Sequence, residues 1–268
     1  MLPVGVSRST RARVAICVVI NACCVLAGET FCSSAAAKDA GDYLGDAKAY
    51  VLAPLYWDEE DWAGFAATAA AVAAAHHYDD NVRAHFAPAG FSSGDPHELR
   101  DFLPAAALTG GVLLTGLLGD QKALSTSFDM IESAVFAGAT TEVLKFAAGR
   151  DRPDETVDSS RWFTGGDSFP SLHTSVAFAV AASFAERDAD NQWARRIVAY
   201  GLATGTAYLR VKDSQHWLSD TVAGAAIGIS TGVFVNHRGS GAHRSAGNWS
   251  VSPMPGGGIG IAYTHDLD

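Results

Sequence analysis

The residues best suited to chemistry lie in one short stretch, in which a cation, a histidine and an acid follow as Arg210, His216 and Asp220. If the next helix begins near Gln215, His216 and Asp220 lie four residues apart on one helix face, and the carboxylate can hold the imidazole. The other ring nitrogen is then available as a nucleophile or a base. Arg210 would lie in the preceding loop, where its planar set of donors suits an oxyanion. A His–acid pair at this spacing is also common in structural roles, so the stretch gains meaning only from what precedes it.

Two further cations stand at the end of the helix predicted over residues 128–148. Lys145 lies on the last turn of that helix, and Gly149 is typical of a helix C-terminus. Pro153 keeps Arg152 out of helical conformation, so that Arg152 reaches in from the loop. Lys145 and Arg152 would repel each other unless an anion lies between them. For Lys145 alone, the alternative is that its charge complements the helix dipole.

A serine and a histidine mark the start of the helix predicted from Ser171 to Arg187, because Pro170 and Ser171 form a helix start signal. The first backbone N–H groups of a helix, here those of Leu172 and His173, have no partner within the helix. Such amides, together with a hydroxyl, readily bind an anion. The alternative is that Ser171 only caps the helix and that His173 is a polar residue of its first turn.

Along the chain, the three groups read Lys145-x6-Arg152-Pro153, Pro170-Ser171-x-His173 and Arg210-x5-His216-x3-Asp220, each at a predicted helix boundary. This arrangement resembles the type 2 phosphatidic acid phosphatase superfamily, which also includes bacterial non-specific acid phosphatases and vanadium haloperoxidases. The resemblance runs from about Ile131 to Asn236. It implies a metal-independent phosphatase acting on phosphate monoesters, with a lipid phosphate, an isoprenyl diphosphate or a small soluble phosphoester as the substrate.

The resemblance also implies a role for each motif residue. His216 would attack phosphorus and become a phosphohistidine, while Asp220 would hold its tautomer. His173 would protonate the leaving alcohol and later activate water. The phosphate would be bound by Lys145, Arg152, Ser171, the backbone amide of Leu172, and Arg210. No metal ion and no other cofactor are expected.

Two positions depart from the family pattern. Leu172 stands where the family usually has glycine, and Leu209 stands where it usually has serine. Leu172 keeps the backbone amide but adds a side chain that could crowd the phosphate. We therefore expect an altered substrate preference or a lower rate before an inactive protein.

Two other functions fit the same motifs. In a vanadium-dependent haloperoxidase, the same cations would hold vanadate as a cofactor and His216 would ligate it. A non-catalytic bundle that only binds a phosphorylated ligand is the other alternative. Asp151 and Asp167 border the motifs and could serve in substrate selection or be solvated loop residues.

The elements that must position these residues are helices. Six Ala- and Gly-rich stretches, each with a face of small residues, predict an all-α bundle of about six core helices: Trp62–His77, Phe102–Gly119, Phe128–Ala148, Ser171–Arg187, Trp193–Leu209 and Trp217–Asn236. The acids at 58–61 would cap the first of them. The cluster of His76, His77, Asp79 and Asp80 could hold a metal, but a polar helix end is the better interpretation. The segments 78–101 and 154–168 are predicted to be loops facing the substrate.

The chain divides into three parts by composition. Residues 1–37 place three arginines before an apolar run and a small-residue stretch, which is the order of a signal peptide cleaved after Ala37; a retained membrane anchor is the alternative. All four cysteines lie in this part, so the remaining chain can form no disulfide. Residues 38–238 would form the phosphatase-like bundle. Residues 239–268 begin as a Gly/Ser-rich connection and end in the alternation of Ile259, Ile261 and Tyr263, which predicts a short β-like tail.

The charge of the chain restricts its partners. The formal net charge is −10, and the predicted signal peptide contributes three arginines against one glutamate, so the rest is more acidic still. Such a chain does not suit nucleic acid, nor anionic lipid through basic patches. We expect a phosphorylated small-molecule or lipid substrate and an exported protein, periplasmic or secreted, for which membrane contact is open; an integral inner-membrane protein is the alternative.

Overall fold

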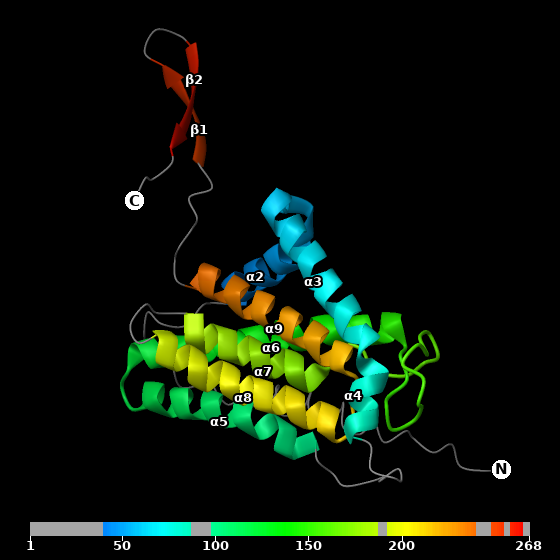
Figure 1. Cartoon of the computed structure of the whole chain (residues 1–268). Helices are drawn as coiled ribbons and strands as arrows, with labels where there is room; N and C mark the ends of the chain where they lie inside the picture. The colour runs from blue at the N-terminus through cyan, green and yellow to red at the C-terminus, as the bar shows by residue number, and fades with distance from the viewer. Residues whose placement is uncertain (1–39, 87–97, 187–191, 240–247, 255–257, 265–268) are drawn as a thin grey trace, which may run out of the picture. The chain divides into compact units, whose positions relative to one another are not determined.

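The structure is a computed structural model that describes residues 40–86, 98–186, 192–239, 248–254 and 258–264 (Figure 1). The predicted signal peptide, residues 1–37, lies outside the described residues. The helices are α2 (Ala40–Leu52), the 3-10 helix η1 (Ala53–Tyr56), α3 (Glu59–His77), α4 (Asp79–Phe86), α5 (Glu98–Leu117), α6 (Gln121–Ala148), α7 (Leu172–Glu186), α8 (Gln192–Lys212) and α9 (Leu218–Gly239). The all-α fold is confirmed, and α3 and α5 to α9 correspond to the six predicted helices.

Helix α4 corrects the prediction of a continuous loop over residues 78–101. Asp79 and Asp80 stand in its first turn, and Arg83 and His85 in its last, so its charges complement the helix dipole at both ends. The charged residues of this segment therefore favour a short helix. The acids before α3 act as predicted, because Asp58 forms a capping box with Asp61.

Helix α7 is the central helix of the bundle, packing against α6, α8 and α9 (Figure 1). Most of its residues are buried, and many of them are alanine, as at Ala179 and Ala182. Short side chains let three neighbouring helices approach one helix at once. The core of the molecule thus lies along α7, the helix that opens with Ser171 and His173.

A stripe of glycines brings α9 against α7. A Cβ atom built at Gly224 would lie 2.8 Å from the carbonyl oxygen of Ser171, directly before α7, and one built at Gly228 or Gly232 would lie 2.4 or 2.6 Å from a backbone carbonyl oxygen of α7. No side chain fits at such distances, so glycine every fourth residue sets the separation of these two helices. This is the small-residue face predicted for the last helix.

The C-terminal residues form the antiparallel pair β1 (Asn248–Met254) and β2 (Gly258–Thr264). Trp249 lies opposite Tyr263, and Val251 opposite Ile261. The alternation of Ile259, Ile261 and Tyr263 thus belongs to a two-stranded hairpin, which agrees with the predicted β-like tail.

Among the described helices, the segment Leu218–Arg238 is long and apolar enough to cross a membrane, judged by length and composition. Half of its most apolar window is buried in the molecule, where it packs against α7. A core helix of a soluble protein has the same properties. This helix alone does not distinguish the two predicted locations.

Candidate active site

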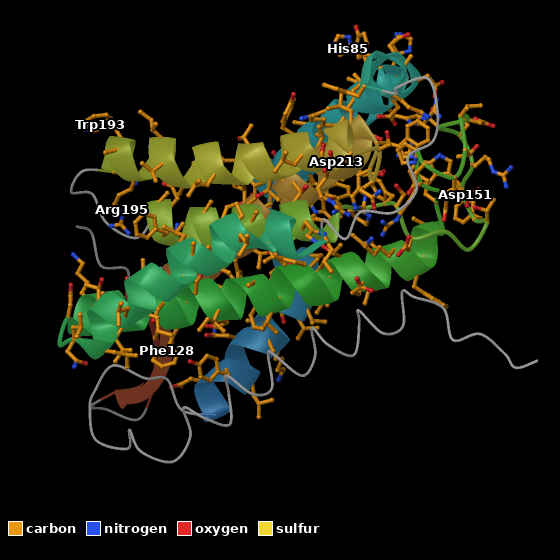
Figure 2. All side chains as sticks on the ribbon, turned by 90° about the horizontal axis from the view of Figure 1, so that it is seen from below. His85, Phe128, Asp151, Trp193, Arg195 and Asp213 are labelled. Atoms are coloured by element: carbon orange, nitrogen blue, oxygen red, sulfur yellow. The ribbon has the colours of Figure 1, made fainter. Side chains whose placement is uncertain are left out.

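Helix ends from separate parts of the chain meet at one end of the bundle. Figure 2 shows Asp151, just after α6, and Asp213, just after α8, on the same side of the molecule, whereas Phe128 and Trp193, near the starts of those helices, lie on the other. Helix α7 begins directly after Ser171, whose backbone N–H donates to the Asp220 carbonyl in α9 at 3.1 Å. The three motifs therefore converge.

Lys145 lies on the last turn of α6, which ends at Gly149 in the left-handed conformation, as predicted. The side chain is buried, and its Nζ donates to the backbone carbonyl of Asp167. Loss of hydration by burial lowers the pKa of Lys145 to about 8, and the carboxylate of Asp167 opposes this shift. The lysine is thus a cation whose charge can be lost in mildly alkaline solution.

Arg152 is held by the same residue as Lys145. Its Nε donates to Asp167 Oδ1 at 2.8 Å and its Nη2 to Asp167 Oδ2 at 3.1 Å, so carboxylate and guanidinium face each other in a two-pronged pair. The remaining nitrogen, Nη1, donates to Gln215 Oε1 at 3.1 Å. Asp167 therefore links the two cations that the sequence assigns to phosphate.

The motif at the start of α7 is buried. Ser171 Oγ accepts a hydrogen bond from Thr174 Oγ1 at 3.0 Å, which leaves the hydroxyl proton of Ser171 to be donated elsewhere. The ring of His173 lies against Phe102, with centroids 3.9 Å apart. A Cβ built at Gly138 of α6 would lie 3.8 Å from Leu172 Cδ1, so the Leu172 side chain is directed towards α6 at a position without a side chain.

Arg210 corrects the prediction that it would lie in a loop, because α8 continues to Lys212 and Arg210 lies in its last turn. The side chain is 1% exposed. Its backbone carbonyl accepts hydrogen bonds from the N–H of Gln215 at 3.0 Å and of His216 at 3.2 Å. The end of α8 thereby fixes the backbone that presents His216.

His216 precedes α9 instead of lying inside it, which corrects the predicted helix start near Gln215. Its Nδ1 lies 2.7 Å from the carbonyl oxygen of Ser168, and the Asp220 carboxylate is farther away at 3.6 Å. Since a carbonyl oxygen only accepts, Nδ1 carries the proton and Nε2 carries the lone pair. The tautomer predicted for this histidine is therefore set mainly by a backbone carbonyl.

The surroundings of His216 are cationic. Burial lowers the pKa of His216 well below its usual value, and the charges of Arg210, Lys145, Arg152 and His173 act in the same direction. The ring is therefore neutral in mild acid. The cations predicted to bind phosphate, Lys145, Arg152 and Arg210, are therefore close enough to act on the charge of His216.

Asp220 has partners other than the predicted one. Its carboxylate accepts from Arg150 Nη1 at 2.5 Å, from the Trp217 N–H at 2.9 Å, and from the hydroxyl of Ser168. Burial raises the pKa of Asp220, while the charge of Arg150 and these hydrogen bonds oppose the rise. Asp220 thus acts on His216 chiefly through Ser168, whose hydroxyl it binds and whose carbonyl holds the ring.

Arg150 is the residue that sequence reasoning missed. It is fully buried, and besides Asp220 it donates to Asp79 Oδ2 at 2.7 Å and to the Ser159 carbonyl at 2.7 Å. The Trp162 ring lies 4.4 Å from its guanidinium carbon. The sequence signal that could have identified it is a third basic residue between Lys145 and Arg152 in the first motif.

The polar cluster at the end of α3 belongs to this network. His76 Nδ1 lies 2.9 Å from Asp79 Oδ2, and Asp79 also accepts from the backbone N–H and the hydroxyl of Ser219. Asp80 accepts from the Ser159 N–H at 3.3 Å. Asp79 therefore binds a buried arginine and the start of α9, while Asp80 binds the loop at Ser159.

The loop that carries Asp167 and Ser168 is tied to the end of α6. The backbone of Ser168 donates to the carbonyl of Arg150 at 2.9 Å. A Cβ at Gly166 would lie 2.2 Å from that carbonyl oxygen, so only glycine fits there. This contact fixes the position of the carbonyl that holds His216.

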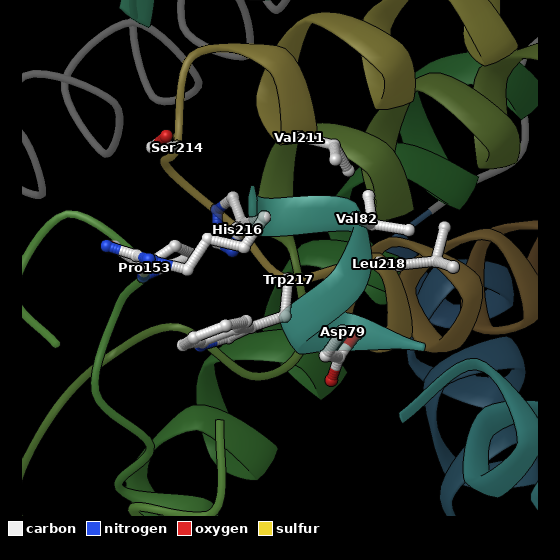
Figure 3. A pocket seen from close by; sticks show the side chains of 9 residues that line it. Asp79, Val82, Pro153, Val211, Ser214, His216, Trp217 and Leu218 are labelled. Atoms are coloured by element: carbon white, nitrogen blue, oxygen red, sulfur yellow. The ribbon is translucent and has the colours of Figure 1, made fainter. Parts of the chain in front are cut away.

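A shallow crevice borders His216 on the side of α4 (Figure 3). Its walls include Val82 and Arg83 of α4, Pro153, and Trp217. Lys145, Arg152 and Arg210 do not line it, so it lies beside the group of cations and does not coincide with it.

Part of the chain is similar to known proteins. The model of the PAP2 superfamily matches residues 127–242. A lipid A 1-phosphatase of Porphyromonas gingivalis is 35% identical over 96 residues, which are 35% of this chain and 20% of that protein; the chain thus spans about a fifth of the relative's length. The crystal structure of Aquifex aeolicus LpxE is similar with a TM-score of 0.33 and 22% identity, covering 54% of this chain and 88% of that one. The segment that matches the PAP2 superfamily model, residues 127–242, contains all three motifs, so the predicted site lies within the part of the chain that is similar to this family.

Proposed function

We propose that this chain is a metal-independent phosphatase that hydrolyses a phosphate monoester through a phosphohistidine at His216. The proposal depends on the tautomer and the protonation state of the His216 ring. Its Nδ1 is bound to the Ser168 carbonyl, and its neutral form is favoured by the cations around it. A buried imidazole with a lone pair on Nε2, surrounded by cations that attract an anion, is suited to attack phosphorus.

The mechanism has two steps. His216 Nε2 attacks phosphorus, the bond from phosphorus to the alcohol oxygen breaks, and His173 gives that oxygen a proton. His173 then takes a proton from water, whose oxygen attacks phosphorus, and the P–N bond breaks to release inorganic phosphate. Charge on the phosphoryl oxygens is stabilised by Lys145, Arg152, Arg210, the Ser171 hydroxyl and the Leu172 amide. These steps use no metal ion and no other cofactor.

We propose a phosphorylated lipid as the substrate class. The relative from Porphyromonas gingivalis bears the name of a lipid A phosphatase. Large apolar side chains of α2, η1 and α3 are exposed, namely Leu44, Val51, Leu55, Tyr56, Trp62 and Phe65. Exposed apolar patches of this kind suit contact with a membrane surface, where a lipid substrate would be found. The location proposed is the exported side of a membrane.

The experiment that tests this proposal traps phosphate on the protein. The full chain is mixed with a substrate bearing a labelled phosphate, quenched in alkali, which preserves phosphohistidine, and digested for mass spectrometry. We expect label on the peptide with His216, and neither label nor turnover in His216→Ala. His237→Ala, at the exposed end of α9, is the control and should behave as the unchanged protein.

Two results would contradict the proposal. Bound but unhydrolysed substrate, with no label on His216, would indicate a bundle that only binds phosphorylated ligands. Halide oxidation with added vanadate and peroxide, in the absence of phosphate release, would indicate a haloperoxidase.

A further inference from the structure

Asp167 touches both cations of the first motif with different atoms. Its carboxylate meets Arg152 through two hydrogen bonds of 2.8 and 3.1 Å, and its backbone carbonyl accepts from Lys145 Nζ. The pair of side chains is mostly buried, with Arg152 18% and Asp167 30% exposed. One loop residue thus occupies the groups that the proposed mechanism assigns to phosphate.

We propose that Asp167 is an internal competitor of phosphate for Arg152. Its carboxylate occupies the guanidinium while the site is empty, gives way when a phosphate binds, and returns as inorganic phosphate leaves. The inference rests on the proposed function in that Arg152 is taken as a phosphate ligand. It makes Asp167 a positioning residue that sets affinity and product release, with no part in the bonds that change.

The geometry of the pair supports this exchange. Carboxylates and phosphates both accept bidentate hydrogen bonds from the same edge of a guanidinium. Nε and Nη2 of Arg152 therefore cannot donate fully to Asp167 and to phosphate at the same time. The third nitrogen, Nη1, is bound to Gln215, whose Nε2 lies 3.3 Å from Asp154 Oδ2. Arg152 therefore stays in place when its partner changes, and only the Asp167 side chain has to move.

The position of Asp167 in the chain makes the exchange local. The next residue, Ser168, is held by the Arg150 carbonyl through its N–H and holds His216 through its own carbonyl. The contact of Lys145 with Asp167 uses the backbone, which a side-chain movement leaves intact. Displacing the carboxylate thus need not disturb the nucleophile.

The test compares Asp167→Asn with Asp151→Asn. Asparagine keeps the shape of residue 167 and removes its charge, so the competitor is weakened and repulsion of the phosphate is lost. The control removes the same charge from the same loop, where Asp151 binds Arg161 at 2.7 Å and Thr164 at 2.5 Å and touches neither motif cation. Binding of inorganic phosphate to each full chain is measured by calorimetry, and kcat and KM with p-nitrophenyl phosphate.

For Asp167→Asn we expect Kd for inorganic phosphate to fall at least about tenfold, because phosphate no longer has to displace a carboxylate from Arg152 in order to bind. KM should fall in parallel, and kcat should stay level or fall as product release slows. Asp167→Glu, which restores the carboxylate, should return Kd towards that of the unchanged protein, and Asp151→Asn should leave Kd within about twofold.

An unchanged or raised Kd in Asp167→Asn would overturn the inference, because a merely structural partner of Arg152 would loosen the site when removed. This result is separable from the fate of the proposed function. A tighter Kd without any hydrolysis by the unchanged protein would refute the phosphatase and keep the competitor. Hydrolysis through His216 without a tighter Kd would do the reverse.

Discussion

At the scale of single residues, the position of His216, the proposed nucleophile, depends on a backbone carbonyl more than on an acid. His216 is held by the Ser168 carbonyl at 2.7 Å, while Asp220 binds Arg150, Trp217 and the Ser168 hydroxyl. Replacing Asp220 therefore removes a hydrogen bond that holds Ser168, while the Ser168 carbonyl itself still contacts His216. The proton on Nδ1 keeps its acceptor.

For Asp220→Asn we expect kcat to fall by roughly 10- to 100-fold, less than the roughly 10⁴-fold loss that follows when a catalytic histidine adopts the wrong tautomer. The loss of the charge beside buried Arg150 should lower the free energy of unfolding by about 3 kcal/mol. Steady-state rates and urea unfolding measure the two effects. A rate as low as that of His216→Ala in a folded protein would show that the carboxylate itself sets the tautomer.

The lowered pKa of Lys145 predicts how phosphate binding depends on pH. Burial brings the pKa of this lysine to about 8, so its charge is present below that pH and is lost above it. Affinity for inorganic phosphate should therefore weaken as pH rises through about 8, although phosphate is already a dianion. In Lys145→Arg, whose side chain stays charged, the decline should move to higher pH. Calorimetric titrations between pH 6 and 10 measure it, and an identical decline in both proteins would assign it to another group.

At the scale of elements, the separation of α7 and α9 brings the second and third motifs together. Ser171 precedes α7, and its backbone binds the carbonyl of Asp220 in α9. That contact requires helix axes that approach closely, which the glycine stripe of α9 permits. A bulkier residue in the stripe would separate the motifs as well as loosen the core.

Gly228→Ala tests this packing. The added Cβ would lie 2.4 Å from the Ser175 carbonyl oxygen and 2.7 Å from the Ala179 nitrogen, both backbone atoms that move only with their helix. We expect a loss of about 1–3 kcal/mol in the free energy of unfolding, together with lower activity. Gly205→Ala in α8, where a Cβ meets nothing within 4 Å, is the matched control and should gain about 0.5–1 kcal/mol. Equal unfolding midpoints for the two variants would contradict this account.

At the scale of the whole molecule, Arg150 connects the matched region, residues 127–242, to a segment that lies outside it. Asp79 lies in α4, outside residues 127–242, yet it binds Arg150 and the first turn of α9. The Arg150 guanidinium is buried and depends on protein acceptors for its hydrogen bonds. Removing one partner of a buried charge strongly destabilises the folded protein. The segment before the matched region therefore helps to hold Arg150 and the start of α9 in position.

For Asp79→Ala we expect the free energy of unfolding to drop by about 3–5 kcal/mol, because Arg150 keeps its charge in a buried place. The neighbouring Asp80→Ala removes an exposed acid with one long hydrogen bond to Ser159, so its effect should stay within about 0.5 kcal/mol. Urea unfolding of both variants measures the difference. Similar midpoints would mean that Arg150 is satisfied without α4.

The sequence by itself determined the motif residues, the all-α class and the helix ends at Asp58, Gly149 and Ser171. These features follow from local chemistry: capping side chains, a left-handed glycine, and small residues at helical spacing all act within a few positions. The predicted loop over 78–101 and the helix starting near Gln215 were wrong, because boundary residues suit both a helix and a turn.

Only the tertiary structure decided what surrounds the motif residues. His216 is bound by a carbonyl 48 positions away, and Arg150 by a carboxylate 71 positions away. Every residue carries a carbonyl, so no residue type marks the one that fixes the imidazole. Likewise, an acid in a loop is solvated or paired according to the distant chain folded against it, as Asp167 is against Arg152. Such contacts arise from packing between helices, and no local pattern in the sequence records them.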